Sequence, residues 1–213
     1  HILGTFANLT FAGSIQNILV IFGKVFVVVI ILHLLYITAL FVISGIIGGK
    51  SPLMLIKNQI PAYFTAVGTQ SSAATIPVSL MSAEKNGISE QIRNFVIPLC
   101  ATIHLAGSMI TITCCSTAVI LILGQNPTYA SILPFILMLG IAMVAAPGAP
   151  GGAIMSALPF LYMVGITGDE LQGLMIALYL TQDSFGTAAN VSGDNAIAVF
   201  VDWLYKTKIK KEA

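Results

Sequence analysis

The feature that most constrains this chain is a long stretch without any charged side chain. From Asn94 to Gly168 the sequence contains no Lys, Arg, Asp or Glu. A helix that crosses a bilayer needs about 20 apolar residues, so this stretch is long enough for several passes. Charged residues make up 8% of the chain, hydrophobic residues 57%, and the mean hydropathy is +0.95. Soluble domains carry about 25% charged residues, so the sequence predicts an all-α membrane protein with the lipid bilayer as its surroundings.

Charge and cysteine usage exclude other classes of protein. The net charge is +1 and no basic patch with interleaved aromatic residues occurs, so we expect no nucleic-acid partner. Cys100, Cys114 and Cys115 lack the spacing of metal ligands and lie in apolar sequence, which predicts small core residues rather than disulfides. The chain runs from His1 directly into apolar sequence, so we expect no signal peptide and a longer protein whose N-terminal part precedes it.

Three segments have the length of membrane spans: residues 14–48, 89–123 and 168–205. The third is predicted to be one continuous helix with Thr167 at its N-cap. The second concentrates helix-breaking and polar residues at its centre, which predicts a broken helix with exposed carbonyl groups. Residues 1–13 are interpreted as the tail of a truncated span, and residues 206–213 as a basic tail in the cytoplasm.

Two further segments, residues 51–86 and 128–165, are apolar but consist of arms that are too short to span a bilayer. The first has small hydroxyl residues at its tip, Gly68 to Pro77, and the second has the sequence from Ala145 to Gly152, rich in Pro and Gly. Irregular backbone at membrane depth is tolerated where it is buried in protein or lines a cavity. Both segments therefore predict re-entrant hairpins, the second with a flexible tip that could act as a gate; for the first, an ordinary loop outside the membrane is the alternative.

A polar stripe marks the last span. Asp183 and Asp194 are the only charged residues between Leu171 and Val201. With Thr187 and Asn190 they follow the spacing i, i+4, i+7, i+11, which places all four on one face of a helix. A carboxylate at membrane depth is costly unless it lines a cavity, pairs, or binds a cation. We therefore expect a ligand or ion site here, with a buried structural network of hydrogen bonds as the alternative.

Four stretches, in this order, carry a resemblance to a known family. They are residues 70–77 (QSSAATIP), 97–108 (IPLCATIHLAGS), 148–155 (GAPGGAIM) and the last-span segment from Asp183 to Asp194. The chain resembles the glutamate-transporter family, the dicarboxylate and amino acid:cation symporters. The resemblance implies the transport-domain half of that fold, with two re-entrant helical hairpins and a broken transmembrane helix. It also implies a multi-pass cell-membrane protein, a homotrimer, whose transport domains move like elevators against a scaffold.

The resemblance implies a small amino-acid substrate and assigns residues to it. Asp183 matches the carboxylate that binds the substrate ammonium group, and Ser71 and Ser72 match the tip that meets its α-carboxylate. The full set of substrate-binding residues implied is Ser71, Ser72, Ser108, Gly148, Ala149, Asp183, Thr187 and Asn190.

The resemblance also implies bound Na⁺. One site is closed by Asp194 beside Asn190, with the carbonyl of Cys100; a second lies beneath the gate. Oxygen ligands of this kind suit hard cations. The full set of metal-binding residues implied is Cys100, Thr102, His104, Met143, Val144, Ala146, Asn190 and Asp194.

Two departures from the family pattern bear on substrate and coupling ion. Gly186 stands where acidic-amino-acid transporters carry an arginine that clamps the side-chain carboxylate. We expect it to leave space and no positive charge, so the substrate is predicted to be neutral. The residues His104-Leu105-Ala106 replace Asn-Met-Asp, so Ala106 removes an acidic ligand of one sodium site. Fewer Na⁺ ions, or H⁺ in place of one, are the expected consequences, since histidine commonly changes charge near neutral pH.

Other functions compete with a symporter of neutral amino acids. A dicarboxylate symporter of the same family is the first alternative, and a channel is the second. An intramembrane aspartyl protease needs two aspartates in near contact. Asp183 and Asp194 lie three helical turns apart, roughly 16 Å at 1.5 Å per residue, which disfavours this chemistry. We therefore predict that the protein is not an enzyme.

Overall fold

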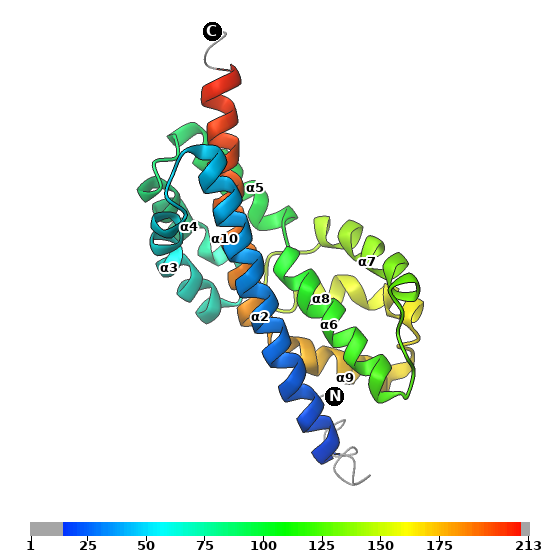
Figure 1. Cartoon of the computed structure of the whole chain (residues 1–213). Coiled ribbons are helices and arrows are strands. Elements are labelled where there is room, and N and C mark those ends of the chain that lie inside the picture. Colours follow the sequence, from blue (N-terminus) through cyan, green and yellow to red (C-terminus); the bar gives the residue numbers. More distant parts are fainter. Residues whose placement is uncertain (1–14, 210–213) are drawn as a thin grey trace.

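The computed structural model describes residues 15–209, and within them the chain is helical, with no strand (Figure 1). The all-α prediction is confirmed. The helices are α2 Ile15–Gly48, α3 Pro52–Thr69, α4 Ser72–Lys85, α5 Glu90–Ile103, α6 Ala106–Ile122, α7 Tyr129–Val144, α8 Gly152–Ala157, η1 Leu158–Val164, α9 Gly168–Leu180, α10 Asp183–Leu204 and η2 Tyr205–Ile209. The predicted tail of a truncated span, residues 1–13, lies outside the described residues, as does the end of the predicted basic tail, residues 210–213.

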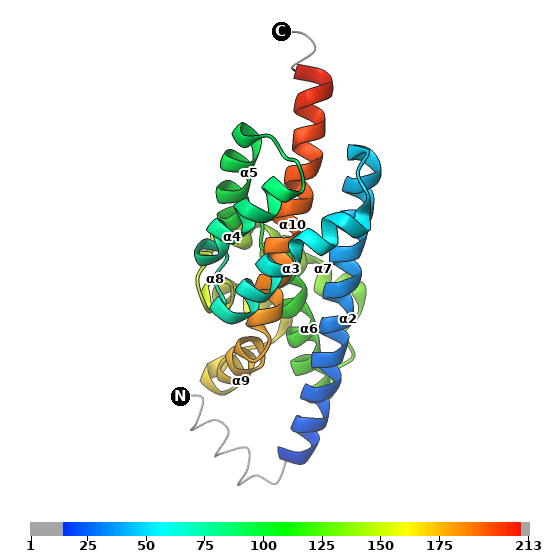
Figure 2. The same cartoon turned by 90° about the vertical axis from the view of Figure 1, so that its left-hand side faces the viewer.

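Helices α2 and α10 lie side by side and form the axis of the molecule (Figures 1 and 2). The α3–α4 pair packs on one side of this axis, and the helices from α6 to α9 pack on the other. Two helical stretches are long and apolar enough to cross a membrane, residues 20–48 and the combined α5–α6 stretch, residues 90–122.

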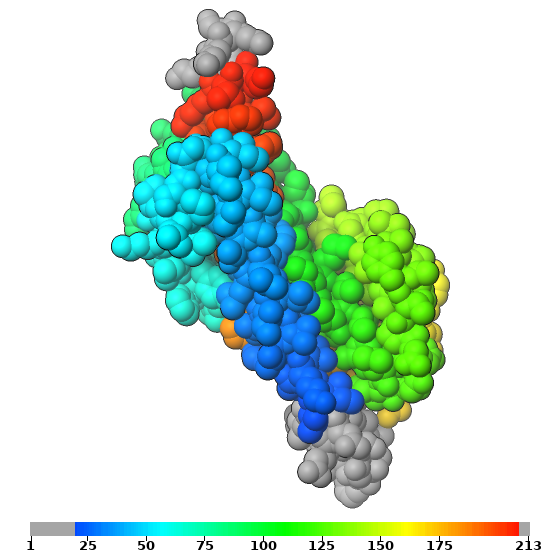
Figure 3. All heavy atoms as spheres, viewed as in Figure 1, coloured from blue at the N-terminus to red at the C-terminus, as the bar shows by residue number. Residues whose placement is uncertain are grey.

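Helix α2 covers one face of the molecule and leaves a row of large apolar side chains uncovered (Figure 3). Val27, Leu35 and Ile46 are each more than half exposed, whereas His33 and Phe41 of the same helix are buried. Apolar surface of this extent is unfavourable in water and favourable against lipid or further protein. This exposure agrees with the membrane environment predicted from the composition.

The first predicted hairpin consists of α3 and α4, joined by a turn at Gln70 and Ser71. Gln70 has φ 53°, and its backbone N–H closes α3 on the carbonyl of Ala66. Ser71 begins α4 as its N-cap, where its side chain accepts a hydrogen bond from Ala74 N. The turn is therefore specified by one left-handed residue and one capping hydroxyl, and the two helices pack against each other.

The second predicted hairpin has a long first arm and a short second arm. Thr128 and Ser131 start α7 with a reciprocal capping box, and α7 ends at Val144. The tip then turns through Pro147 and Pro150 to Gly151, which has φ +72°. A Cβ at the next residue, Gly152, would lie 2.3 Å from the carbonyl oxygen of Pro147, so the tip folds only with glycine there.

The last predicted span is not one continuous helix. It divides into α9 and α10 at Thr181 and Gln182, so the expectation of a single helix over residues 168–205 is wrong. Thr181 Oγ1 and Gln182 Nε2 both donate to the carbonyl oxygen of Leu178, at 2.7 and 3.1 Å. These side chains compete with backbone donors for the helical carbonyl, which is how threonine and amide side chains weaken helix continuity.

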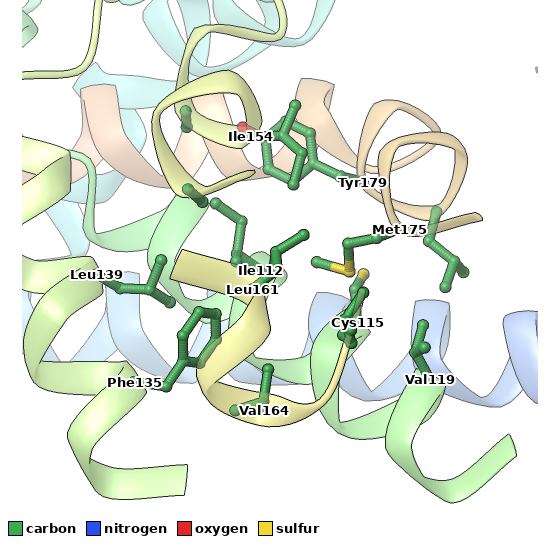
Figure 4. Packing of buried hydrophobic residues seen from close by; sticks show 14 of the residues in the cluster. Ile112, Cys115, Val119, Phe135, Leu139, Ile154, Leu161, Val164, Met175 and Tyr179 are labelled. Carbon is green, nitrogen blue, oxygen red and sulfur yellow. The ribbon is translucent and has the colours of Figure 1, made fainter. Parts of the chain in front are cut away.

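The main apolar core lies between α6, α7, η1 and α9 (Figure 4). Ile112 of α6 and Leu161 of η1 lie toward Phe135 and Leu139 of α7, whereas Cys115 of α6 lies beside Met175 of α9. Cys115 is free and fully buried in this cluster. The remaining cysteines are also free, as expected for core residues rather than a disulfide framework. This core supports one side of a polar site at the centre of the molecule.

Candidate functional site

The polar site lies where four interruptions of the helices meet: the two hairpin tips, the α5–α6 break and the α9–α10 break. A cavity of about 10 Å³ lies between them, room for about one water molecule. Its lining carries one acidic residue, Asp183, and no Lys or Arg. The lining residues are Gln70, Ser72, Leu105, Ser108, Pro147, Gly148, Ala149, Ala153, Tyr179, Asp183, Thr187 and Asn190. Among the residues predicted to bind substrate, only Ser71 is not in the lining.

Asp183 is the first residue of α10 and is 2% exposed. Its Oδ2 atom accepts from the backbone N–H of Gly151 at 2.8 Å, and Oδ1 accepts from the Tyr179 hydroxyl at 2.7 Å. Thr187 Oγ1 lies 3.5 Å from Oδ1. The carboxylate thus stands at the positive end of the helix dipole, which stabilises negative charge. The sequence reading had placed it within a longer helix, and the α9–α10 break moves it to a helix end.

Asn190 caps the broken helix. Its Oδ1 atom accepts from the backbone N–H groups of Gly107 and Ser108, at 2.7 and 3.2 Å, in the first turn of α6. Its Nδ2 atom donates to Ser108 Oγ at 2.9 Å. The first N–H groups of any helix lack partners within the helix, so this side chain from α10 satisfies donors that the predicted break exposes.

A directed chain of hydrogen bonds joins these two residues. Because the Asp183 carboxylate accepts, the Tyr179 hydroxyl donates to it, and the Ser108 hydroxyl, 3.2 Å from the Tyr179 oxygen, is free to donate in turn. Asn190 donates to Ser108 at the start of the chain. Tyr179 was not among the predicted site residues. Its position four residues before Asp183 extends the i, i+4 stripe by one step and was the signal in the sequence.

The two hairpin tips touch each other above this chain. The carbonyl oxygen of Gly148 accepts from the Ser71 hydroxyl at 2.7 Å and from the backbone N–H of Ala73 at 3.2 Å. A Cβ at Gly148 would lie 2.5 Å from the carbonyl oxygen of Ala101, so glycine is needed for this approach. Ser71 thus faces the second tip, whereas Ser72 and Ala149 line the cavity itself.

Gly186 does not leave open space, contrary to the sequence expectation. A Cβ there would lie 3.2 Å from Thr111 Oγ1, because α10 crosses α6 closely at this point. The matching position on α6 is tighter, since a Cβ at Gly107 would lie 2.3 Å from the carbonyl oxygen of Gly186. The site nevertheless lacks a cationic side chain, because none of the lining residues is basic.

His104 joins three elements at the α5–α6 break. Its Nδ1 atom lies 2.8 Å from Asp194 Oδ1 on α10, and its Nε2 atom lies 2.8 Å from the Tyr36 hydroxyl on α2. Asp194 is 2% exposed. Two residues of the predicted metal set therefore contact each other directly, with both imidazole nitrogens engaged.

The residues predicted to hold Na⁺ beside Asp194 make contacts with other protein groups in this geometry. The amide oxygen of Asn190 already accepts two backbone N–H groups, and the Cys100 carbonyl accepts from the backbone N–H of His104 at 2.8 Å. One carboxylate oxygen of Asp194 is held by His104. The Asn190 amide oxygen has both lone pairs engaged and His104 occupies Asp194 Oδ1, so these two oxygens as arranged are not available to a bound Na⁺.

The second predicted set lies at the C-terminal end of α7, where the Met143 carbonyl accepts from the backbone N–H of Ala146 at 3.4 Å. Met143 and Val144 end α7, Ala146 follows them, and α7 lies against α5, which carries Thr102. The last carbonyl groups of a helix lack partners within the helix and form its negative end. Thr102 donates to the carbonyl of Leu99 at 2.8 Å, which leaves its oxygen able to accept or to bind a cation. Oxygen ligands at a helix C-terminus are of the kind that suits a hard cation such as Na⁺. Among the residues described, no group of three or more His, Cys, Asp or Glu side chains lies together as an alternative metal site.

Comparison with known proteins agrees with this arrangement. The chain is 28% identical over 198 residues to excitatory amino acid transporter 1 of Rattus norvegicus, covering 92% of this chain and 35% of the relative. It is 32% identical over 162 residues to the serine/threonine transporter SstT of Acinetobacter baylyi, covering 71% of this chain and 41% of the relative. The chain thus spans a little over a third of the length of these relatives.

The family match covers almost all of the chain. The sodium:dicarboxylate symporter family matches residues 1–204, which include both hairpins, both breaks and the polar stripe. The family and these relatives are transporters rather than enzymes, which supports the predicted membrane location and excludes the protease alternative. On its sequence, the chain belongs to the sodium:dicarboxylate symporter family.

Proposed function

We propose that this chain forms the substrate-binding half of a secondary active symporter for a small neutral amino acid. The observation that carries the proposal is a lone carboxylate, Asp183, in a polar cavity that is lined by no basic residue. A carboxylate in such surroundings suits a substrate ammonium group, which would replace the backbone N–H of Gly151 as its donor.

Each part of an amino acid has a complementary group in this proposal. The ammonium group binds Asp183, with Thr187 beside it. The α-carboxylate binds near Ser72 at the start of α4, where the positive end of the helix dipole favours an anion and where movement of the gate would free the Ala73 N–H from the Gly148 carbonyl. A substrate with a second carboxylate finds no cationic partner in the lining, which disfavours the dicarboxylate alternative. Serine, threonine or alanine fit this chemistry, and the name of the SstT relative agrees with the first two.

The second hairpin acts as the gate in this proposal. The cavity of about 10 Å³ is too small for an amino acid, so a tip must move before substrate enters. Three hydrogen bonds hold the second tip: Ser71 and Ala73 to the Gly148 carbonyl, and Gly151 to Asp183. Substrate that takes Asp183 removes the last of them, which links occupancy of the site to the position of the gate.

Coupling to Na⁺ follows from the second oxygen set. Carbonyl groups at Met143, Val144 and Ala146, with the Thr102 hydroxyl, would hold the ion at the end of α7. Bound Na⁺ would supply positive charge beneath the gate. Coupling to H⁺ is the alternative that the experiment below distinguishes.

The remaining features of the proposal concern the whole protein. The α3–α4 and α7–η1 hairpins are re-entrant, and with α5–α6 and α10 they form a transport domain in a multi-pass cell-membrane protein. Its C-terminus lies in the cytoplasm, next to the lysines after α10. The full-length protein is a homotrimer, and its transport domains move as elevators.

The experiment is uptake of radiolabelled amino acids into proteoliposomes that contain the full-length protein, under imposed Na⁺ or H⁺ gradients. Saturable uptake of serine, threonine or alanine driven by Na⁺ is expected, and Asp183→Asn should abolish it. Asp169→Asn, the same change at an exposed position in the first turn of α9 and outside the cavity lining, is the matched control and should transport normally. Micromolar competition by aspartate, or unchanged affinity in Asp183→Asn, contradicts the proposal.

A further inference from the structure

A chain of side chains crosses the molecule where the predicted cation site would lie. Tyr36 of α2, His104 at the α5–α6 break and Asp194 of α10 are joined by two contacts of 2.8 Å. An ionised carboxylate only accepts hydrogen bonds, so the Nδ1–H group of His104 donates to Asp194. The Nε2 atom then accepts from the Tyr36 hydroxyl. Every group in the chain has a partner of the right kind.

The space beside Asp194 is filled by the imidazole ring. A Cβ on Gly193 would lie 2.4 Å from His104 Cε1 and 3.1 Å from the Tyr36 hydroxyl. The ring therefore lies directly on the backbone of α10, at a position that only glycine permits. A metal ion in contact with Asp194 Oδ1 would have to displace this ring from both of its hydrogen bonds.

A second contact from α2 reinforces this position. His33, one helical turn before Tyr36, lies with Nε2 2.9 Å from the carbonyl oxygen of Gly107, three residues after His104. His33 and Tyr36 are three residues apart on α2, and their partners Gly107 and His104 are three residues apart at the break. The break is fixed by protein groups on both sides, by α2 here and by Asn190 of α10.

We propose that His104 replaces a bound metal cation at Asp194, so that hydrogen bonds rather than Na⁺ tie α2, the α5–α6 break and α10 together. Asp194 is then a structural carboxylate and not an ion ligand in this chain. This inference rests on the proposed function for its binding assay. It deepens that function, because it removes one Na⁺ ion from those coupled to substrate binding. Coupling at the end of α7 is unaffected by it.

The test uses the full-length protein and counts Na⁺ by its effect on binding and stability. The affinity for serine is measured at several NaCl concentrations, with choline chloride keeping the ionic strength constant. The slope of log affinity against log Na⁺ concentration gives the number of ions coupled to substrate. The same salt series without substrate gives the rise in unfolding temperature that Na⁺ itself produces. The variants are Asp194→Asn and His104→Asn, and Asn195→Ala is the matched control on α10.

The proposal expects Asp194→Asn to leave both Na⁺ responses as they are in the wild type, as in the control. It expects His104→Asn to raise the slope by about one, because a freed carboxylate and an added amide oxygen create an ion site. A slope that falls by about one in Asp194→Asn alone overturns the proposal. Where Asp194→Asn does not fold, an unchanged or lower slope in His104→Asn overturns it.

Failure of the proposed function gives a different result. If the wild type binds no amino acid, the symporter proposal fails, yet the substrate-free series still decides the role of Asp194. An Na⁺-dependent rise in unfolding temperature that Asp194→Asn removes would place the ion at Asp194. The same rise in wild type and variant, or none in either, supports His104 as the substitute.

Discussion

Replacing Asn190 with alanine should destabilise the protein far more than the same change at Asn195. Both side chains are buried on α10, at 1% and 0% exposure. Asn190 makes three hydrogen bonds to the first turn of α6, whereas both polar atoms of Asn195 lack a partner among the described residues. The two substitutions therefore remove the same atoms from the same helix, and they differ in the hydrogen bonds lost.

The expected magnitude follows from the two backbone N–H groups that Asn190→Ala leaves unpaired. An unsatisfied buried donor costs about 1–3 kcal/mol, so the pair costs about 2–6 kcal/mol. The adjacent cavity has room for about one water molecule, which can satisfy one of the two donors. We therefore expect about 1–3 kcal/mol, or about 2–12 °C in unfolding temperature for a unit of this size.

The assay is thermal unfolding of the full-length protein in detergent, with both alanine variants. Asn195→Ala should be neutral or stabilising, because it removes a buried amide without partners. Equal losses in Asn190→Ala and Asn195→Ala would refute the capping role.

Two further predictions follow from close contacts at the site. Gly107→Ala should abolish stable folding, because its Cβ would lie 2.3 Å from a backbone oxygen. Gly186→Ala should lower the unfolding temperature only slightly, since the nearest neighbour of its Cβ is a side-chain hydroxyl at 3.2 Å. Similar losses of stability in the two variants would contradict the close crossing of α6 and α10. Tyr179→Phe should weaken amino-acid binding about tenfold or more, because a hydrogen bond to a charged group contributes about 1.5–3 kcal/mol. Tyr63→Phe on α3, outside the cavity lining, is its control, and unchanged serine affinity in Tyr179→Phe would contradict the role of the hydroxyl.

The positions of the helices could largely be predicted from the sequence. Proline, glycine and small hydroxyl residues marked both hairpin tips and the α5–α6 break, since each acts on the backbone locally. The α9–α10 break was missed because Thr181 and Gln182 are compatible with a helix. They end α9 through hydrogen bonds to the Leu178 carbonyl. The pattern of apolar residues does not indicate that these side chains form hydrogen bonds to the backbone.

The partners of the site residues were harder to predict than the residues themselves. Asp183, Asn190 and Asp194 were found because polar groups are conspicuous in an apolar helix. That Asn190 caps α6, or that Tyr36 reaches His104, depends on how helices far apart in sequence cross. Gly186 shows the same limit, because a missing side chain indicates open space only when the neighbouring helix is distant, and here α6 lies against it.

In the proposed function, the meeting of four chain interruptions would let this site hold a zwitterion without a basic side chain. The N-termini of α4 and α10 bring positive helix ends toward the cavity, and α7 ends nearby with its negative end. Charges of both signs are therefore supplied by the backbone, which carries no ionisable group and needs no counter-ion in an apolar surrounding. Asp183 adds the one full charge, and its position at a helix N-terminus lets that charge persist in a buried cavity until a substrate ammonium group replaces the N–H of Gly151.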